Sequence, residues 1–126
     1  MKDGMKKVLL VDDDAVLRIG MKTLVDWQQH GYILIGEASD GAQAMELVEQ
    51  HRPDIVITDM KMPGMDGLEA ARAILEEDPA ARIVIVSSLA YDDTMEEAGQ
   101  IGARGFLYKP FDRETLLAAL DKAMED

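Results

Sequence analysis

Two apolar stretches of the sequence each run directly into carboxylates. Residues 8–11, VLLV, are followed by Asp12 and Asp13, and residues 55–58, IVIT, are followed by Asp59. Unit charges about 4 Å apart repel by about 4 kcal/mol at an effective dielectric constant of about 20, so these carboxylates need a counter-charge if they meet. Hard oxygen ligands of this kind suit Mg²⁺, which keeps several waters and takes one or two carboxylates together with a phosphate oxygen.

Polar residues also follow two later apolar stretches. Ser87 and Ser88 come directly after RIVIV, and Lys109 comes after GFLY and before Pro110. Each residue alone has an ordinary explanation, because a strand-end aspartate is more often a helix cap and an isolated lysine is more often a surface charge. Together, a lysine, hydroxyls and backbone N–H groups beside a carboxylate cluster are the components of a phosphoryl-transfer site, with one carboxylate as the nucleophile.

The segments that must position these residues alternate between two patterns. Short β-branched runs predict five strands, and between them apolar residues recur at spacings of three and four, as in amphipathic helices. Near-continuous apolar strands that alternate with helices indicate a parallel sheet covered on both faces, that is, a doubly wound, three-layer α/β domain of (βα)5 type. The expected strands cover residues 8–11, 32–38, 54–58, 82–86 and 105–108. An aspartate that can cap the helix stands at or near the start of each expected helix, at Asp14, Asp40, Asp66, Asp92 and Asp112.

The order of the strands decides where these polar residues lie. In open parallel sheets, ligands bind at the carboxyl ends of the strands, where the chain order reverses, and for the flavodoxin-like order 2-1-3-4-5 this point lies between strands 1 and 3. These are the strands that end in acids. The sequence therefore predicts that Asp12, Asp13 and Asp59 converge on one crevice, with Ser87 and Lys109 beside it.

The overall composition limits the classes of partner. The chain has 126 residues, the size of one domain, and its formal net charge is −12. Such an acidic surface repels the phosphates of nucleic acids and anionic membranes. Because there is no cysteine, disulfides, thiolate nucleophiles and Cys-ligated zinc are excluded. With no apolar leader and no long apolar run, we expect a cytoplasmic protein without direct nucleic acid binding or membrane insertion.

Four motifs carry a resemblance to a known family. VLLVDDD, IVITDMKMPGMDGLE, VIVSS and GARGFLYKPF, in this order, resemble the receiver domain of two-component response regulators, the chemotaxis-type phosphoacceptor fold. The resemblance covers residues 6–124, so we expect a single receiver domain over residues 1–126. It implies a signalling domain that accepts a phosphoryl group on Asp59 from a sensor histidine kinase in an Mg²⁺-dependent reaction. Such a domain catalyses only its own phosphorylation and dephosphorylation.

The same resemblance implies roles for further residues. Lys109 would pair with the phosphoryl group, Ser87 would hydrogen-bond to it, and Phe106 would be the switch aromatic that acts with Ser87, where many members carry Tyr. The Lys109–Pro110 peptide is implied to be cis, which X–Pro bonds tolerate at small cost. The implied Mg²⁺ ligands are Asp13, Asp59 and the backbone carbonyl of Lys61, with Asp12 acting through a bound water. The implied phosphoryl-binding N–H groups are those of Met60, Lys61 and Ser88.

The partners follow from the resemblance, and the output remains open. A sensor kinase or phosphotransfer protein would act upstream, and an output domain or protein would bind the face formed by the fourth helix, fifth strand and fifth helix. A homodimer formed on phosphorylation is a further expectation. VDWQQHGY and IGEASDG resemble receivers fused to AraC-type, DNA-binding transcription factors, whereas DMKMPGMDG resembles single-domain phosphorelay intermediates.

Two other classes share parts of this pattern. A flavodoxin-like FMN carrier is rejected, because Asp12, Asp13 and Asp14 would repel its phosphate. A haloacid-dehalogenase-like phosphatase is the less favoured enzyme alternative, since its first-strand signature continues into Thr or Gly where this chain has Ala15 and Val16.

Overall fold

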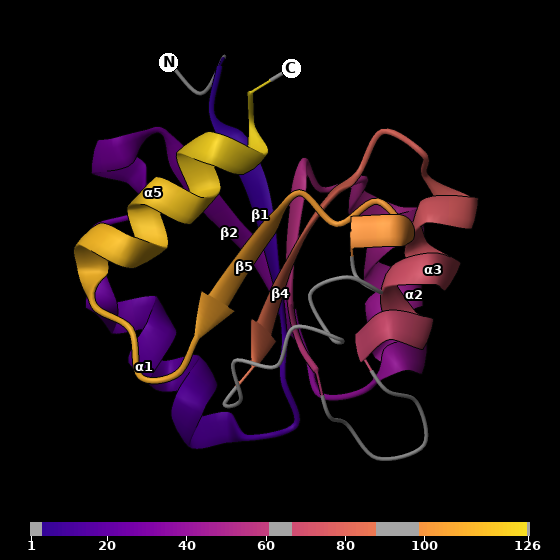
Figure 1. The fold of residues 1–126 in the computed structure, drawn as a ribbon, viewed down its shortest axis with the longest axis horizontal. Coiled ribbons are helices and arrows are strands. Elements are labelled where there is room, and N and C mark those ends of the chain that lie inside the picture. The colour runs from indigo at the N-terminus through magenta and orange to yellow at the C-terminus, as the bar shows by residue number, and fades with distance from the viewer. Residues whose placement is uncertain (1–3, 61–66, 88–98, 126) are drawn as a thin grey trace.

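The computed structural model describes residues 4–60, 67–87 and 99–125, and within them five parallel strands form one sheet in the order β2-β1-β3-β4-β5. The strands are β1 (Lys6–Val11), β2 (Tyr32–Ala38), β3 (Ile55–Asp59), β4 (Arg82–Ser87) and β5 (Gly105–Tyr108). The described helices are α1 (Ala15–Leu24), the 3-10 helix η1 (Gln28–His30), α2 (Gly41–His51), α3 (Gly67–Glu77) and α5 (Arg113–Ala123). In Figure 1, α1 and α5 cover one face of the sheet and α2 and α3 cover the other. The predicted three-layer α/β fold and its strand order are confirmed.

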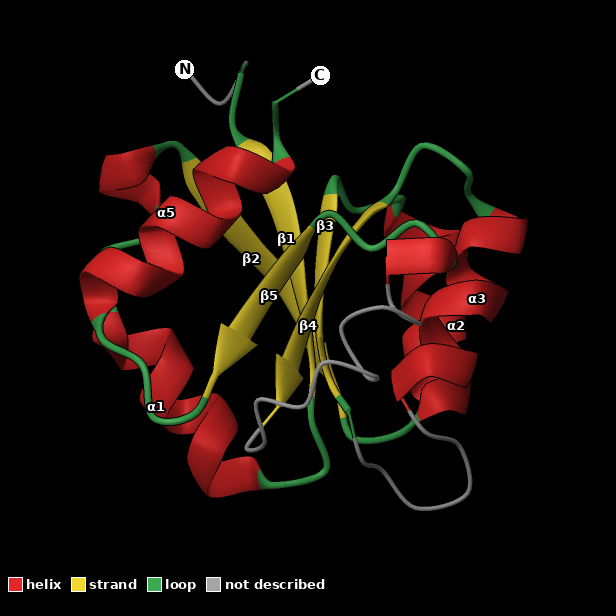
Figure 2. Ribbon diagram, in the orientation of Figure 1, coloured by secondary structure: helices red, strands yellow, loops and turns green. Residues whose placement is uncertain are grey.

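Alternation along the strands divides the core into two clusters. In β1, Val8 and Leu10 pack into the cluster on the side of α1 and α5, whereas Leu9 and Val11 pack into the cluster on the side of α2 and α3. Successive side chains of a strand point to opposite faces of the sheet, so a strand covered on both faces must be apolar throughout. Figure 2 shows the sheet between its two helical layers. Polar side chains are therefore confined to the ends of the strands.

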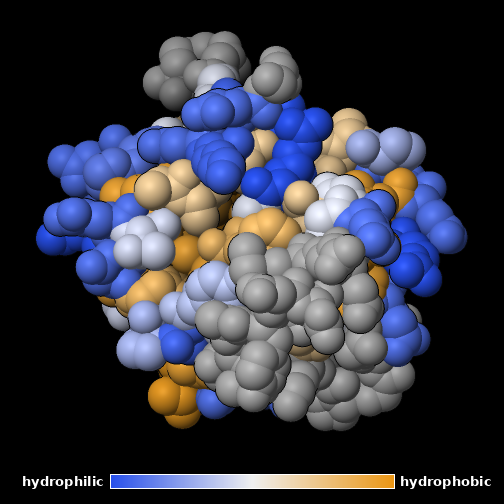
Figure 3. Space-filling view, in the orientation of Figure 1, coloured by the Kyte–Doolittle hydropathy of each residue, from blue (hydrophilic) through white to orange (hydrophobic). Residues whose placement is uncertain are grey.

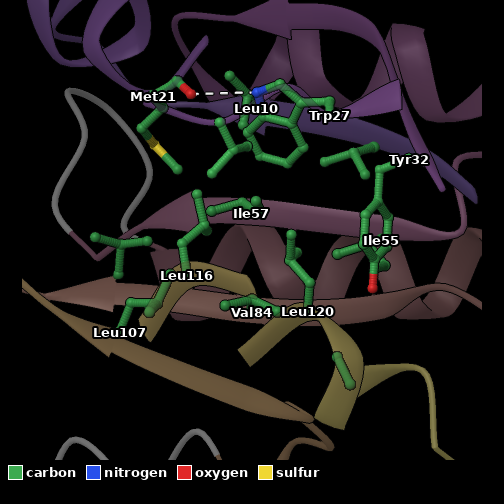
Figure 4. Close-up of a cluster of buried hydrophobic side chains, with 14 residues drawn as sticks. Leu10, Met21, Trp27, Tyr32, Ile55, Ile57, Val84, Leu107, Leu116 and Leu120 are labelled. Carbon is green, nitrogen blue, oxygen red and sulfur yellow. Dashed lines mark hydrogen bonds between the residues drawn. The ribbon is translucent and has the colours of Figure 1, made fainter. Parts of the chain in front are cut away.

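One tryptophan and one tyrosine complete the core beside α1 and α5. The Trp27 side chain is 5% exposed, and its Nε1 donates to the backbone carbonyl of Met21 at 3.3 Å (Figure 4). The Tyr32 hydroxyl donates to Asp121 Oδ1 at 2.7 Å, which ties the start of β2 to α5. Both aromatic residues thus bury their rings and satisfy their polar atoms.

Aspartate caps begin three of the helices, as the sequence predicts. Each cap side chain accepts a hydrogen bond from a backbone N–H in the first turn, which satisfies a donor that has no partner within the helix. The caps are Asp14 of α1, Asp40 of α2 and Asp112 of α5. The predicted caps Asp66 and Asp92 lie outside the described residues, as does most of the helix predicted between β4 and β5.

The surface of α1 carries exposed apolar side chains. Val16 is 74% exposed and Ile19 is 56% exposed. Hydrophobic atoms over α1 are visible at the lower left of the face drawn in Figure 3, whose upper rim is mostly hydrophilic. Among the described residues, no helix has both the length and the apolar character to span a bilayer.

Candidate functional site

Three carboxylates from two strand ends meet at one edge of the sheet. Asp12 follows β1 and Asp59 ends β3, and these strands are neighbours with Val11 opposite Thr58. One carboxylate oxygen from each of Asp12, Asp13 and Asp59 lies within 4.8 Å of the others. The predicted convergence is therefore confirmed. This edge lies toward the bottom of Figure 1, where the arrows of β4 and β5 end.

Lys109 brings a positive charge to this cluster. Its Nζ lies 3.1 Å from Asp59 Oδ1 and 3.8 Å from Asp12 Oδ2. The backbone N–H of Lys109 donates to the carbonyl of Ser87 at 2.8 Å, and the Lys109–Pro110 peptide is cis, as the family resemblance implies. The pairing of β4 with β5 thus continues to Lys109 and places its ammonium group beside the carboxylates.

The Asp12 carboxyl is buried and accepts a hydrogen bond from the backbone. Burial raises its pKa above the ordinary value, and the charges of Asp59 and Asp13 add to this effect, while the hydrogen bond from the Asp14 N–H and the Lys109 ammonium oppose it. A further cation in the crevice would favour the ionised form and act against the effect of burial. These electrostatics suit a cation site made of oxygen ligands.

Ser87 and Phe106 lie on the two strands at the other side of the cluster. Ser87 is buried at the end of β4, where it pairs with Tyr108, and Phe106 pairs with Ile85 two steps earlier along the same strands. The Phe106 side chain is half-buried and packs against the core on the side of α2 and α3. A change at Ser87 would therefore occur two strand-pair steps away from Phe106, on the same face of the sheet.

One predicted site residue is used differently in the structure. The backbone N–H of Met60 donates to the carbonyl of Val86 at 2.9 Å, which extends the pairing of β3 with β4. A phosphoryl-binding role of Met60 would require this donor to leave the Val86 carbonyl, and that role stays a prediction. Lys61 and Ser88 lie outside the described residues, so their predicted roles stay predictions.

Three features of the site were not predicted. The Arg18 guanidinium bonds to the backbone carbonyl of Asp12, and the backbone of Gly67 packs against the peptide that follows Asp59. The available signals in the sequence were weak: Arg18 lies four residues after Asp14, and Gly67 comes shortly after Pro63 and Gly64. A cavity of about 280 Å³ adjoins Asp12 and Lys109, with walls that are mostly apolar. Its lining residues are Asp12, Leu17, Gly20, Met21, Leu24, Val86, Lys109, Pro110 and Phe111.

The protein is a flavodoxin-like α/β domain, because its five-stranded sheet has the order 2-1-3-4-5. Its polar site, made of carboxylates and a lysine, lies at the carboxyl edge of this sheet, at the switch point. The sequence profile of the response regulator receiver domain matches residues 8–121. The chain belongs to this family, which consists of signalling domains of two-component systems rather than classical enzymes. Family membership decides between the receiver and the phosphatase alternatives that the sequence left open.

Some relatives of this chain match it over nearly their whole length, and others match it over only part of their length. The chemotaxis protein CheY of Bacillus subtilis is 36% identical over 118 residues, which cover 94% of this chain and 97% of that protein. The uncharacterized transcriptional regulatory protein YesN of B. subtilis is 34% identical over 122 residues, 97% of this chain but 33% of that protein. The chain likewise spans 57% of the transcriptional regulatory protein PdtaR of Mycobacterium tuberculosis.

Solved structures share the fold closely. The CheX-CheY-BeF3-Mg²⁺ complex of Borrelia burgdorferi has a TM-score of 0.88 and 28% identity, covering 99% of this chain and 98% of that chain. The receiver domain of the response regulator AraT of Geobacillus stearothermophilus has a TM-score of 0.86 and 31% identity, covering 94% of this chain and 92% of that chain.

Proposed function

We propose that Asp59 accepts a phosphoryl group from the phosphohistidine of a sensor kinase or phosphotransfer protein. One observation carries the proposal: the Asp59 carboxylate is 12% exposed, lies beside two further carboxylates and has an ammonium group 3.1 Å away. An Asp59 oxygen attacks the phosphorus, and the bond to the histidine nitrogen breaks with its electron pair on that nitrogen. The imidazole, which carries a proton on its other ring nitrogen, leaves as the neutral ring. The product is an acyl phosphate on Asp59.

The carboxylate cluster fits a divalent cation. Three hard oxygen donors within 4.8 Å, one of them on a buried side chain, match the preference of Mg²⁺ for carboxylates together with waters. Asp13, Asp59 and the backbone carbonyl of Lys61 would hold the ion, with Asp12 acting through a water. When bound, the ion supplies positive charge to the phosphoryl oxygens.

Lys109 and Ser87 would hold the transferred group. The Lys109 ammonium already contacts Asp59, so it can pair with a phosphoryl oxygen on that carboxylate without a change of strand position. The buried Ser87 ends β4, the strand paired with β3, and would donate a hydrogen bond to the same group. A movement of Ser87 toward the phosphoryl group would free space for Phe106 to turn inward and so bias a two-state surface.

Output would leave through the face formed by the fourth helix, β5 and α5. This face would bind an output domain or protein, or a second copy of the chain after phosphorylation. The similarity to the transcriptional regulatory proteins YesN and PdtaR supports a transcriptional output, and the similarity to CheY supports a stand-alone or relay role. Residues 1–126 would form one receiver domain with its core at residues 6–124.

Labelling with a small phosphodonor tests the acceptor. Acetyl phosphate in magnesium buffer is expected to add a single phosphoryl group, detected by intact-protein mass spectrometry and located at Asp59 by peptide mapping. Asp59→Asn removes the nucleophile and should abolish labelling. Asp40→Asn is the matched control, because asparagine caps a helix as well as aspartate does and Asp40 begins α2, outside the acid cluster. Native-rate labelling of Asp59→Asn would show that the acceptor assignment is wrong.

A further inference from the structure

Arg18 joins the acid cluster to the edge of the sheet through a single guanidinium group. Its Nη1 donates to the backbone carbonyl of Asp12, and its Nε donates to Glu37 Oε1 at 3.0 Å. Only 17% of the Arg18 side chain is exposed. The arginine thus connects α1, the loop after β1 and the strand β2.

The contact with Arg18 completes a set of restraints on Asp12. The Asp12 N–H donates to the carbonyl of Ala38 at 3.0 Å, and Asp12 Oδ1 accepts from the Asp14 N–H at 2.9 Å. Its remaining carboxylate oxygen, Oδ2, faces Lys109 at 3.8 Å. The Arg18 bond therefore fixes the carbonyl of the peptide that leads from Asp12 into Asp13, and with it the direction in which the chain presents both carboxylates.

Glu37 orients the guanidinium group. It stands on β2 opposite Leu10 of β1, so its carboxylate lies close to the end of β1 where the acids begin. Lys22, one helical turn after Arg18, contacts the other oxygen of Glu37 at 2.7 Å. Arg18 and Lys22 thus carry the same charge and share Glu37 as a partner. Arg18 also donates a hydrogen bond to the Asp12 carbonyl, which sets it apart from Lys22.

We propose that Arg18 is a positioning residue for the metal site, which holds the Asp12–Asp13 peptide in the orientation that a divalent cation requires. The inference rests on the proposed function. A planar fork can bond to a carbonyl and to a carboxylate at the same time, whereas an ammonium group on a flexible chain is a point charge. Such outer contacts orient the ligands of a metal and change its affinity when they are lost.

The direction in which the Mg²⁺ affinity changes when Arg18 is replaced distinguishes a positioning role from a purely electrostatic one. Arg18 is a positive charge close to the acid cluster, so its removal by charge alone would tighten the binding of a cation. Loss of positioning would weaken it. Removal of the Lys22 charge changes the electrostatics in the same direction and leaves the Asp12 carbonyl contact in place.

The test is the Mg²⁺ dissociation constant of the folded protein, measured by NMR titration of the Asp13 and Asp14 amide signals. Arg18→Gln is expected to weaken Mg²⁺ binding about tenfold. Arg18→Lys keeps the charge and should show a smaller loss. Lys22→Gln should bind Mg²⁺ as tightly as the wild type or slightly more tightly. Urea unfolding of each variant establishes that the titrated protein is folded.

The outcomes distinguish this inference from the proposed function. If the wild type binds Mg²⁺ and Arg18→Gln binds it equally well or more tightly, the positioning role is overturned and the metal site stands. If Lys22→Gln weakens binding as much as Arg18→Gln does, the effect belongs to Glu37, the partner that the two residues share, which also overturns the role of Arg18. A wild-type protein without saturable Mg²⁺ shifts would overturn the metal site itself, and this inference with it.

Discussion

Gly67, the first residue of α3, is expected to tolerate no side chain. A Cβ atom built at this position would lie 2.3 Å from the carbonyl oxygen of Asp59 and 2.8 Å from the Cα of Met60. Both neighbours are backbone atoms, so no side-chain rotation can relieve the contact. The Gly67 N–H also donates to the carbonyl of Met60 at 2.6 Å, which holds the two segments together.

The cost of Gly67→Ala can be worked from this geometry. A normal van der Waals separation requires the segments to move apart by about 1 Å. Overpacking of this kind costs about 1–3 kcal/mol, and the value should lie at the upper end because the backbone itself must move. The gain in helix propensity of up to about 1 kcal/mol offsets part of this, which leaves a net loss of about 2 kcal/mol. Since the peptide of Asp59 moves as well, phosphorylation should slow by about 100-fold.

Two measurements check this prediction. Urea unfolding can be followed through Trp27, the single tryptophan, whose side chain is 5% exposed in the folded state. Labelling by acetyl phosphate gives the relative rate at Asp59. The control is Gly20→Ala inside α1, where a Cβ meets nothing within 4 Å, so stability should rise by about 0.5–1 kcal/mol and labelling should persist. A Gly67→Ala protein with native stability and a native labelling rate would refute the reasoning.

Two further predictions concern the contacts that hold β2. Tyr32 is 4% exposed, and Tyr32→Phe removes its 2.7 Å hydrogen bond to the Asp121 carboxylate, which should lower the free energy of unfolding by about 1.5–3 kcal/mol. Asp121→Asn keeps an acceptor oxygen and should lower this free energy less. Equal losses for the two variants in urea titrations would contradict this account. The hydrogen bond from Lys22, followed by that from Arg18, lowers the pKa of Glu37 below its ordinary value of 4.5. Its stabilisation is therefore present above about pH 4.5 and is lost as the pH falls through the lower folded-state pKa. Because this carboxylate is partly exposed, Glu37→Gln should cost at most about 1 kcal/mol at neutral pH, and urea unfolding curves should show the difference shrinking as the pH falls below 4.5. A difference that is independent of pH would show that charge is not its source.

The fold could be predicted because each strand is apolar on both faces. The predicted and observed strands differ only at their ends. β1 begins at Lys6 rather than at Val8, since Lys6 pairs with Tyr32 of β2. β3 begins at Ile55, because the carboxylate of Asp54 accepts the Lys7 N–H at 2.7 Å and thus acts as a side-chain partner of β1. The ends of a strand depend on which residues of the neighbouring strands pair with it. The apolar periodicity of a single segment does not determine this pairing.

The site could be predicted only as far as strand order determines it. The meeting of Asp12, Asp13 and Asp59 follows from the order of the strands, because the carboxyl ends of parallel neighbours share one edge of a sheet. The use of the Met60 N–H by Val86 and the contact of Gly67 with the Asp59 peptide depend on the path of the backbone after each strand. Composition and spacing do not determine that path.

The two unpredicted contacts have a common physical basis. Carboxylates that repel one another would separate if their backbone were free, and Lys109 attracts their oxygen atoms without fixing the peptides that carry them. Arg18 holds the carbonyl of Asp12 at the end of β1, and Gly67 lies against the carbonyl of Asp59 at the end of β3. Each anchor acts on a main-chain group, so the side-chain oxygens stay available to a cation and a phosphoryl group. The site is therefore held by its backbone, and substitutions that leave every carboxylate in place can still disable it.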